Sequence, residues 1–443
     1  MDEAPSRPAS PLLTRLVDVR PGEGAAAALG FGYFFALLAG YYILRPLREE
    51  MGIRGGVENL PWNFTATLLA MLVAVPLYSA LVARVPRARA VPLVYRFFFA
   101  NLVGFHLLVR LGVAPREVAR AFFVWVSVYN LFVVSVFWSF LADLMTSEQA
   151  KRLFGFVAAG GSAGALAGPA VAGLLAGSLG VANLLLVSAA LLELATQAAS
   201  GLVRWSARSG ASAAREREGR AEGAGPALGG GAFRGIGLVF QDRYLLAIAA
   251  QTLLFTLGST FLYAHTARLV AAAFPDSARR TALFAAVDFA VNLAALLTQS
   301  LATGAFLTRL GLWAALGLVP AFSAAGFLLA AACPSLALLA AFQALRRAAS
   351  YAVERPAREV LFTVVTREEK YKSKSFIDTV VYRLGDSGAA WLAQGLTALG
   401  VGLGGSMLLG APFGLLGLAL ALWLARAERL RESRSTGAGR RSG

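Results

Sequence analysis

The chain has 443 residues, of which 57% are hydrophobic and only 15% are charged, and its formal net charge is +16. A soluble protein needs roughly a quarter of charged residues to cover its surface, so this composition excludes an ordinary soluble enzyme and indicates a membrane protein. Apolar runs of about 20 residues, the length that crosses a bilayer as a helix, recur along the chain. These runs are continuously apolar rather than alternating, which favours helices over a β-barrel.

The rare reactive side chains exclude further classes. Cys333 is the only cysteine, and His106 and His265 are the only histidines, so neither an internal disulfide nor a metal site of cysteine and histidine is expected. No cofactor is expected, and no Ser/His constellation indicates an enzyme. Basic stretches lack interleaved aromatic residues, so nucleic acid is not expected as a partner. Residues 1–24 show no signal peptide.

The apolar runs predict an all-α membrane protein of about twelve transmembrane helices. Residues 1–204 form an N-terminal six-helix half and residues 236–426 a C-terminal six-helix half. Between them, residues 205–235 are rich in Arg, Ser, Gly and Ala and predict a flexible linker, and residues 427–443 form a basic tail. The predicted spans are 25–46, 61–84, 90–113, 118–145, 154–178, 181–204, 243–271, 281–308, 312–333, 335–364, 376–401 and 404–426.

Charge in the loops predicts the orientation. Basic residues follow spans 2, 4 and 10 and fill the linker and the tail, whereas the turns after spans 5, 9 and 11 carry no charge. Because loops rich in Lys and Arg stay in the cytoplasm, both termini are expected there. A bacterial inner membrane is the expected location.

A weak internal repeat relates the two predicted halves at an offset of 220 residues. Residues 146–152 (TSEQAKR) follow span 4 and residues 366–372 (TREEKYK) follow span 10, while Gly168 in span 5 corresponds to Gly388 in span 11. Two parallel six-helix halves resemble the major facilitator architecture, in which the substrate site lies between the halves near the membrane midplane.

The end of span 1 carries the first candidate site. Arg45 and Arg48 are three residues apart and therefore share one helical face. They could attract an anionic substrate into a cavity. Alternatively, both could extend to the outer interface, because about 20 apolar residues precede them.

Span 10 carries the second candidate site, a polar stripe that recurs every three or four residues. A polar stripe inside a span is expected to face a water-filled cavity, and Pro356 is expected to bend the helix. The alternative is a static network of intramembrane salt bridges. The stripe consists of Arg347, Tyr351, Glu354, Arg355 and Arg358.

Two aspartates are further candidate site residues, and a run of glycines raises the question of a phosphate-binding loop. Asp288 in span 8 and Asp386 in span 11 could bind a coupling cation or proton, or could neutralise a nearby arginine; the sequence leaves both open. Span 5 contains Gly155, Gly160, Gly161, Gly164 and Gly168 but lacks the Gly-Lys-Ser/Thr of a phosphate loop. Its glycines predict close helix packing instead.

Three blocks give the chain a family resemblance. Residues 42–48 (YILRPLR), 137–152 and 356–388 resemble the ATP/ADP translocase family of intracellular bacteria and plastids, a relative of the major facilitator superfamily. The resemblance implies nucleotide exchange, with Arg48 and Arg358 in place of two substrate-binding lysines. The family's paired acids fall near Val126 and Tyr263 here, and neither is acidic, so the chain resembles a divergent member.

The leading hypothesis is therefore a secondary transporter that moves a small anionic solute, nucleotide- or phosphate-containing, by alternating access. One alternative is a proton-coupled exporter of a small organic solute, with Asp288 or Glu354 as the proton carrier. Another is a membrane interaction or sensory protein that has lost transport. The expected partners are the solute and the lipid bilayer, and a monomer is one open interpretation of the working unit.

Overall fold

The computed structural model describes residues 20, 22–84, 87–209 and 234–439. Within these residues the chain forms helices and no strand. Ten of the described helices are long and apolar enough to cross a membrane. The chain is therefore an all-α, multi-pass membrane protein, which confirms the fold class predicted from composition.

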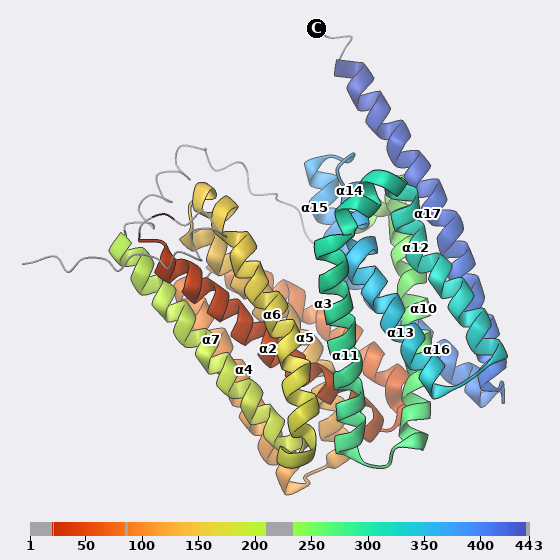
Figure 1. Ribbon diagram of the computed structural model, residues 1–443, viewed down its shortest axis with the longest axis horizontal. Helices are drawn as coiled ribbons and strands as arrows, with labels where there is room; N and C mark the ends of the chain where they lie inside the picture. Colours follow the sequence, from red (N-terminus) through yellow and green to blue (C-terminus); the bar gives the residue numbers. More distant parts are fainter. Residues whose placement is uncertain (1–19, 21, 85–86, 210–233, 440–443) are drawn as a thin grey trace, which may run out of the picture. The chain divides into compact units, whose positions relative to one another are not determined.

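From α2 to α7 and from α9 to α17, most neighbouring helices in the described residues are joined by short connections (Figure 1). A 3-10 turn (Val57–Asn59) precedes α3, and a glycine of positive φ, Gly311, interrupts α12. The helices are α2 (Gly24–Arg54), α3 (Leu60–Arg84), α4 (Arg87–Leu111), α5 (Pro115–Leu144), α6 (Ser147–Leu179), α7 (Val181–Ser209), α9 (Arg234–Gln241), α10 (Arg243–Ala273), α11 (Ser277–Leu301), α12 (Thr303–Ala332), α13 (Leu336–Ala349), α14 (Arg355–Leu361), α15 (Arg367–Phe376), α16 (Tyr382–Ala398) and α17 (Leu403–Gly439).

Two further helical runs are composite. The first agrees with the predicted span 335–364, and the second covers most of the predicted span 376–401 but begins earlier, at Arg367. The π-helical segment η2 (Ser350–Glu354) joins α13 to α14, and a second, η3 (Ile377–Val381), joins α15 to α16. In a π-helix the hydrogen bond reaches one residue further than in an α-helix, so the side chains after it change register. Short π-helical segments occur frequently at functional sites.

Many predicted boundaries agree with the structure, but α2, α6, α12 and α17 each extend several residues beyond the predicted span at one end, and one predicted span crosses a break between two helices. The predicted span 281–308 extends beyond α11, which ends at Leu301, because hydropathy does not detect the backbone break at Ala302 (φ −126°, ψ −28°). Two helices, α9 and α15, fall where loops were expected. Residues 210–233 of the predicted linker lie outside the described residues.

Contacts divide the chain into two compact units. Unit 1 comprises Met1–Met51, Ala74–Ala227 and Asp276–Phe289. Unit 2 comprises the remaining segments, so α3 and α11 each contribute residues to both units. The predicted halves, 1–204 and 236–426, follow chain order and stay a prediction. The segments of unit 2 are Gly52–Val73, Leu228–Pro275 and Ala290–Gly443.

Aromatic side chains fill the core of unit 1 between α2 and α5. The Phe34 and Phe137 rings stack with centroids 4.2 Å apart, and Tyr33 meets Phe137 edge to face at 4.7 Å. The Tyr33 hydroxyl shares a hydrogen bond of 2.6 Å with that of Tyr95, which satisfies two buried polar groups. This packing fixes the face of α2 that carries the candidate arginines further along the helix.

The glycines of α6 let that helix approach α2 closely. A Cβ atom added at Gly164 would lie 2.9 Å from the Ala39 nitrogen, and one at Gly168 would lie 2.6 Å from the Ala39 carbonyl oxygen. Real Cβ atoms do not approach backbone atoms this closely, so only glycine fits there. The structure thus confirms the predicted close helix packing for Gly160, Gly161, Gly164 and Gly168, but not for Gly155, which has no neighbour within 4 Å of an added Cβ atom.

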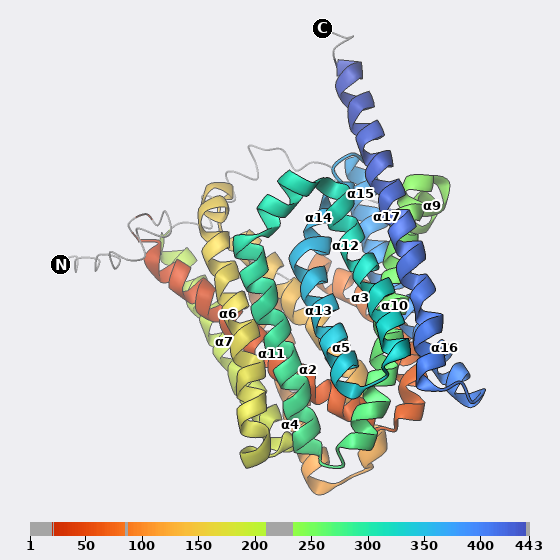
Figure 2. The same ribbon diagram turned by 45° about the vertical axis from the view of Figure 1, so that its right-hand side comes forward.

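In unit 2, α17 lies along α12 in both views (Figure 1, Figure 2). Phe327 of α12 packs against Phe261 of α10, and the Tyr244 hydroxyl donates a hydrogen bond of 2.9 Å to the Leu361 carbonyl. These contacts bring α10, α12 and α14 together around the candidate residues of the C-terminal spans.

The repeated motif has a local structural explanation. Thr146 and Thr366 are both N-cap residues with a capping box: each hydroxyl accepts from the backbone N–H three residues later, and the side chain of Gln149 or Glu369 accepts from the threonine N–H. The spacing Thr-x-x-Gln/Glu is what such a cap requires. The match at an offset of 220 residues therefore marks two equivalent helix starts.

Candidate functional site

The predicted site residues and the charged residues beside them form two groups, one within each unit. The first group, called the α2–α11 cluster, holds three arginines and three carboxylates. The second, called the α13–α16 cluster, holds five arginines and three carboxylates. The α2–α11 cluster consists of Arg45, Arg48, Glu49, Glu50, Arg280 and Asp288; the α13–α16 cluster consists of Arg346, Arg347, Glu354, Arg355, Arg358, Asp378, Arg383 and Asp386.

Arg45 and Asp288 meet within unit 1. The Arg45 Nε atom lies 3.6 Å from the Asp288 Oδ2 atom, and both side chains are largely covered. The guanidinium carbon of Arg45 also lies 5.6 Å from the centre of the Tyr42 ring. Of the two roles that the sequence leaves open for Asp288, the geometry fits the neutralisation of an arginine.

Arg48 is held by a ring, a carboxylate and a carbonyl. Its guanidinium carbon lies 3.8 Å from the centre of the Phe123 ring, and its Nη1 donates 3.0 Å to Glu49 Oε1. The Nε atom donates 3.3 Å to the Phe123 carbonyl. Only 15% of the side chain is exposed, so Arg48 has an ordered and mostly dry environment.

The tightest ion pair of the α2–α11 cluster was not predicted as part of the site. Glu50 is completely buried, and its carboxylate accepts hydrogen bonds of 2.5 and 2.9 Å from Nε and Nη2 of Arg280. The Ser277 hydroxyl donates a third hydrogen bond, of 2.5 Å, to the same carboxylate. A carboxylate with this many donors is stable without water, so the pair fastens the start of α11 to the end of α2.

In unit 2, the predicted polar stripe of span 10 occupies α13, η2 and α14. Its members differ in exposure: Glu354 is buried, Arg355 is exposed, and Arg347, Tyr351 and Arg358 are half-buried. The Arg355 guanidinium lies 4.4 Å from the centre of the Tyr351 ring. Because η2 changes the register within the stripe, the residues do not share one environment.

Arg358 bridges three helical segments. Its Nη2 lies 3.1 Å from Asp378 Oδ1 of η3, and its Nη1 donates 3.3 Å to the Thr252 hydroxyl of α10. The side chain of Asp378 is 36% exposed, so this pair is open to water on the aspartate side. An anionic ligand could therefore replace the aspartate at the guanidinium.

Asp386 of α16 is engaged from two sides. Its Oδ1 accepts 2.5 Å from the Thr260 hydroxyl and its Oδ2 accepts 3.0 Å from Arg383 Nη1. Like Asp288, Asp386 thus neutralises an arginine in this structure. The role of either aspartate in coupling stays a prediction.

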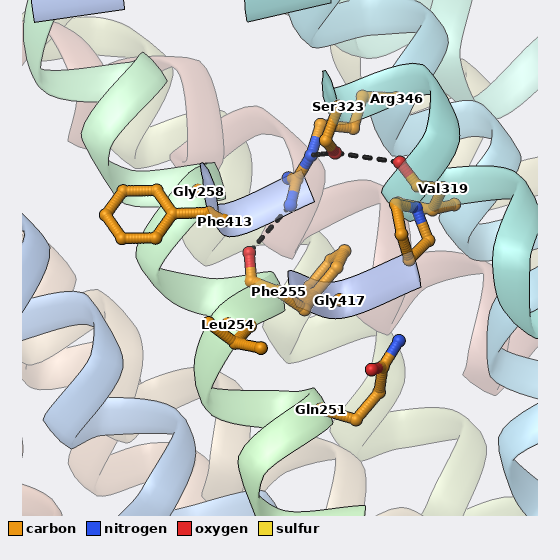
Figure 3. A pocket seen from close by; sticks show the side chains of 10 residues that line it. Gln251, Leu254, Phe255, Gly258, Val319, Ser323, Arg346, Phe413 and Gly417 are labelled. Atoms are coloured by element: carbon orange, nitrogen blue, oxygen red, sulfur yellow. Dashed lines mark hydrogen bonds between the residues drawn. The ribbon is translucent and has the colours of Figure 1, made fainter. Parts of the chain in front are cut away.

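The most completely buried cation of unit 2 is Arg346, next to the predicted Arg347. Only 2% of Arg346 is exposed. Its Nε donates 2.8 Å to the Ser323 hydroxyl and its Nη2 donates 2.7 Å to the Phe255 carbonyl (Figure 3). Adjacent helical residues point in different directions, so the sequence alone could not choose between the two arginines. Buried Glu50 and Arg280 were missed because both lie at span ends, where charge is ordinary.

A pocket opens beside Arg346. Its free volume is about 10 Å³, and Figure 3 shows Gln251 one turn before Phe255 on α10. Gln251 is 4% exposed, and its Oε1 accepts no hydrogen bond from the described residues. The pocket is lined by Gln251, Leu254, Phe255, Gly258, Val319, Pro320, Ser323, Arg346, Phe413 and Gly417.

No group of three or more His, Cys, Asp or Glu side chains in the described part of the chain could hold a metal ion. The arginines and carboxylates of the two clusters can recognise charge. The α2–α11 cluster is balanced, whereas the α13–α16 cluster has two more arginines than carboxylates.

No protein-family model and no curated protein matches the chain. Among solved structures, a bacterial homologue of the iron transporter ferroportin, in an inward-facing state, has a TM-score of 0.61 and 13% identity over 91% of this chain and 98% of that chain. A bacterial homologue of the human lysosomal transporter Spinster, inward-facing and unoccupied, has a TM-score of 0.53 and 15% identity over 96% and 99%.

Both structures are transporters of the major facilitator type, so the chain has a fold of that type. At these identities the likeness is one of fold. The resemblance to ATP/ADP translocases stays a prediction, and the solute has to be argued from the chain's own residues.

Proposed function

We propose that the chain is a secondary transporter that moves a small anionic solute by alternating access. The observation that carries this proposal is the excess of arginine in the α13–α16 cluster, five against three carboxylates, among long apolar helices. Uncompensated positive charge in such helices is costly, so it is retained where it binds something. A negatively charged solute is the ligand that this excess favours.

The solute proposed is a nucleotide or another phosphate-containing anion, with Arg48 and Arg358 as its main ligands. Arginine can grip a phosphate or carboxylate with two parallel hydrogen bonds, and Arg358 is already oriented by a carboxylate. The resemblance to ATP/ADP translocases supports exchange of one nucleotide for another as the specific reaction. The expected setting is the bacterial inner membrane, with both termini in the cytoplasm and a monomer as the working unit.

Counterflow in liposomes tests this proposal. Purified protein is reconstituted, loaded with one unlabelled anion at a time, and offered the labelled form, over a panel of nucleotides and organic phosphates. We expect Arg358→Gln to reduce exchange by about tenfold or more, the loss of roughly one strong charge-assisted contact. Arg243→Gln, which removes an exposed arginine at the start of α10, is the matched control and should keep full exchange.

Two results would contradict the proposal. Equal exchange by Arg358→Gln and wild type would remove Arg358 from the site. Absence of counterflow for every anion in the panel would contradict anion transport and favour a sensory or interaction protein.

A proton-coupled exporter is the second candidate, and one observation favours it. Glu354 is 6% exposed, and its Oε2 accepts no hydrogen bond from the described residues. Asp288, the other proposed proton carrier, lies 3.6 Å from Arg45, so the geometry favours Glu354. In this case transport should depend on a pH gradient in wild type and Asp288→Asn, and lose that dependence in Glu354→Gln. Exchange that ignores the gradient would exclude this candidate.

A further inference from the structure

The Arg346 pocket lies within unit 2. Arg346 belongs to the α13–α16 cluster but is not one of the proposed solute ligands, and without it four arginines of the cluster still face three carboxylates. Two guanidinium nitrogens of Arg346 donate to neutral acceptors, the Ser323 hydroxyl and the Phe255 carbonyl. The guanidinium also lies 4.5 Å from the centre of the Phe255 ring. The side chain is therefore fixed by groups that do not cancel its charge.

No described carboxylate forms an ion pair with Arg346 at 4.0 Å or less. Glu354 acts on Arg346 only at longer range. A buried cation without a close counter-charge is unfavourable, and proteins normally supply such a charge or bind one. The pocket beside the guanidinium is the place where a bound anion could supply it.

The size of the pocket limits what can enter. About 10 Å³ of the pocket is open to the centre of a water-sized sphere, so the pocket has room for a small inorganic ion and not for a nucleotide. A monatomic anion fits this space. The polar lining is compatible with an anion. Rotating the Gln251 amide by half a turn replaces the unpartnered Oε1 acceptor with an Nε2 donor, which is the group that an anion requires.

We infer that the Arg346 pocket binds a single small inorganic anion, chloride being the physiological example. The anion neutralises the buried guanidinium while Gln251 and the aromatic edges of the pocket complete its surroundings. This inference goes beyond the proposed solute transport, since it concerns a separate ion that a transport assay with nucleotides would not show.

Equilibrium dialysis of the purified full-length protein against radiolabelled potassium chloride, with potassium gluconate keeping the ionic strength constant, tests the inference. Wild type is expected to bind about one chloride per chain in a saturable manner. Chloride is also expected to raise the melting temperature of the protein over the same range of chloride concentrations. No transport is measured, so the result is independent of the solute proposal. Wild-type protein that binds no chloride, as a pocket filled by water would, overturns the inference.

Two variants locate the site. Arg346→Gln removes the charge and should abolish binding. Gly258→Ala keeps the charge and fills the pocket: its Cβ would lie 3.5 Å from Arg346 Nη2 and 3.7 Å from Phe413 Cβ, which are ordinary contacts, so the protein should fold. We expect this methyl group to raise the Kd for chloride by about tenfold or more.

The matched control for the methyl group is Gly388→Ala, on a helix of the same unit. Its Cβ would meet only Leu257, at 3.7 Å, and Gly388 does not line the pocket. Gly388→Ala should bind chloride as wild type does. Equal affinity in Gly258→Ala and Gly388→Ala would overturn the assignment to this pocket even if Arg346→Gln failed to fold.

Discussion

The two charged clusters differ in how far their buried arginines are neutralised by carboxylates. In the α2–α11 cluster, three arginines face three carboxylates, and the tightest pair, Glu50 with Arg280, is almost completely dry. In the α13–α16 cluster, five arginines face three carboxylates, two π-helical segments interrupt the helices, and Asp378 is partly open to water. The comparison teaches that a dry and fully paired ion pair, such as Glu50 with Arg280, fastens helices to each other, whereas excess charge beside irregular backbone is available to a ligand.

The largest expected loss of stability follows from removing one charge of the balanced α2–α11 cluster. Glu50→Gln leaves the Arg280 guanidinium buried without its counter-charge, which typically costs about 3–5 kcal/mol. We expect a large fall in the melting temperature of the purified protein, measured by the fluorescence of its tryptophans. Glu50→Gln combined with Arg280→Gln removes both charges and should recover most of the loss.

Removing a carboxylate from the α13–α16 cluster should cost much less stability. Asp378→Asn also removes an arginine's carboxylate, but this side chain is 36% exposed, so the loss of stability should be about 1 kcal/mol or less. A fall as large as that of Glu50→Gln would contradict the distinction between the clusters. So would a double variant of Glu50 and Arg280 that is no more stable than Glu50→Gln alone.

An effect between those of Glu50→Gln and Asp378→Asn concerns the packing of α6 against α2. Gly164→Ala would bring a Cβ atom to 2.9 Å from the Ala39 nitrogen, so α6 and α2 must separate, which costs about 1–3 kcal/mol. Gly155→Ala, on the same helix, meets nothing within 4 Å and should be neutral or slightly stabilising, because alanine favours helix by up to about 1 kcal/mol. Thermal unfolding of the two variants side by side provides the measurement. Equal stability would show that the two helices do not depend on close approach.

The fold was largely predictable because hydropathy reports directly on helices in a bilayer. Runs such as 61–84 correspond closely to helices such as α3, and even the repeated Thr-x-x-Gln/Glu motif proved to be a local capping signal. What failed was local backbone geometry. The break at Ala302 and the turn at Gly311 lie inside apolar sequence, so hydropathy extended one span across the first of them.

The candidate site was predictable only in part. Spacing made Arg45 a candidate, and its position inside a predicted span made Asp288 one, yet only the fold could show that they pair. The choice between Arg346 and Arg347 depends on the direction in which each side chain leaves the helix, and η2 alters the register a few residues later. The stripe was therefore correct as a set of residues but could not be resolved into buried and exposed members.

The smallest expected effect lies at the start of α2, where Glu23 accepts hydrogen bonds of 2.8 Å from both terminal nitrogens of Arg152. Burial alone would raise the pKa of Glu23, but the hydrogen bonds from Arg152, Arg20 and Gln149 outweigh it and hold the pKa below the ordinary value of 4.5. A carboxylate with a lowered folded-state pKa adds stability above its unfolded pKa, and that stability is lost as the pH falls through the folded value.

The melting temperature of wild type should therefore exceed that of Glu23→Gln at neutral pH, and the difference should shrink as the pH is lowered below 4.5. Because Glu23 belongs to neither cluster, the change should leave anion exchange intact. A difference that stays constant on acidification would mean that Glu23 contributes through its shape and hydrogen bonds, independent of its charge. In that case the charge of Glu23 would be incidental to the stability of unit 1, in contrast to the charges of the Glu50–Arg280 pair.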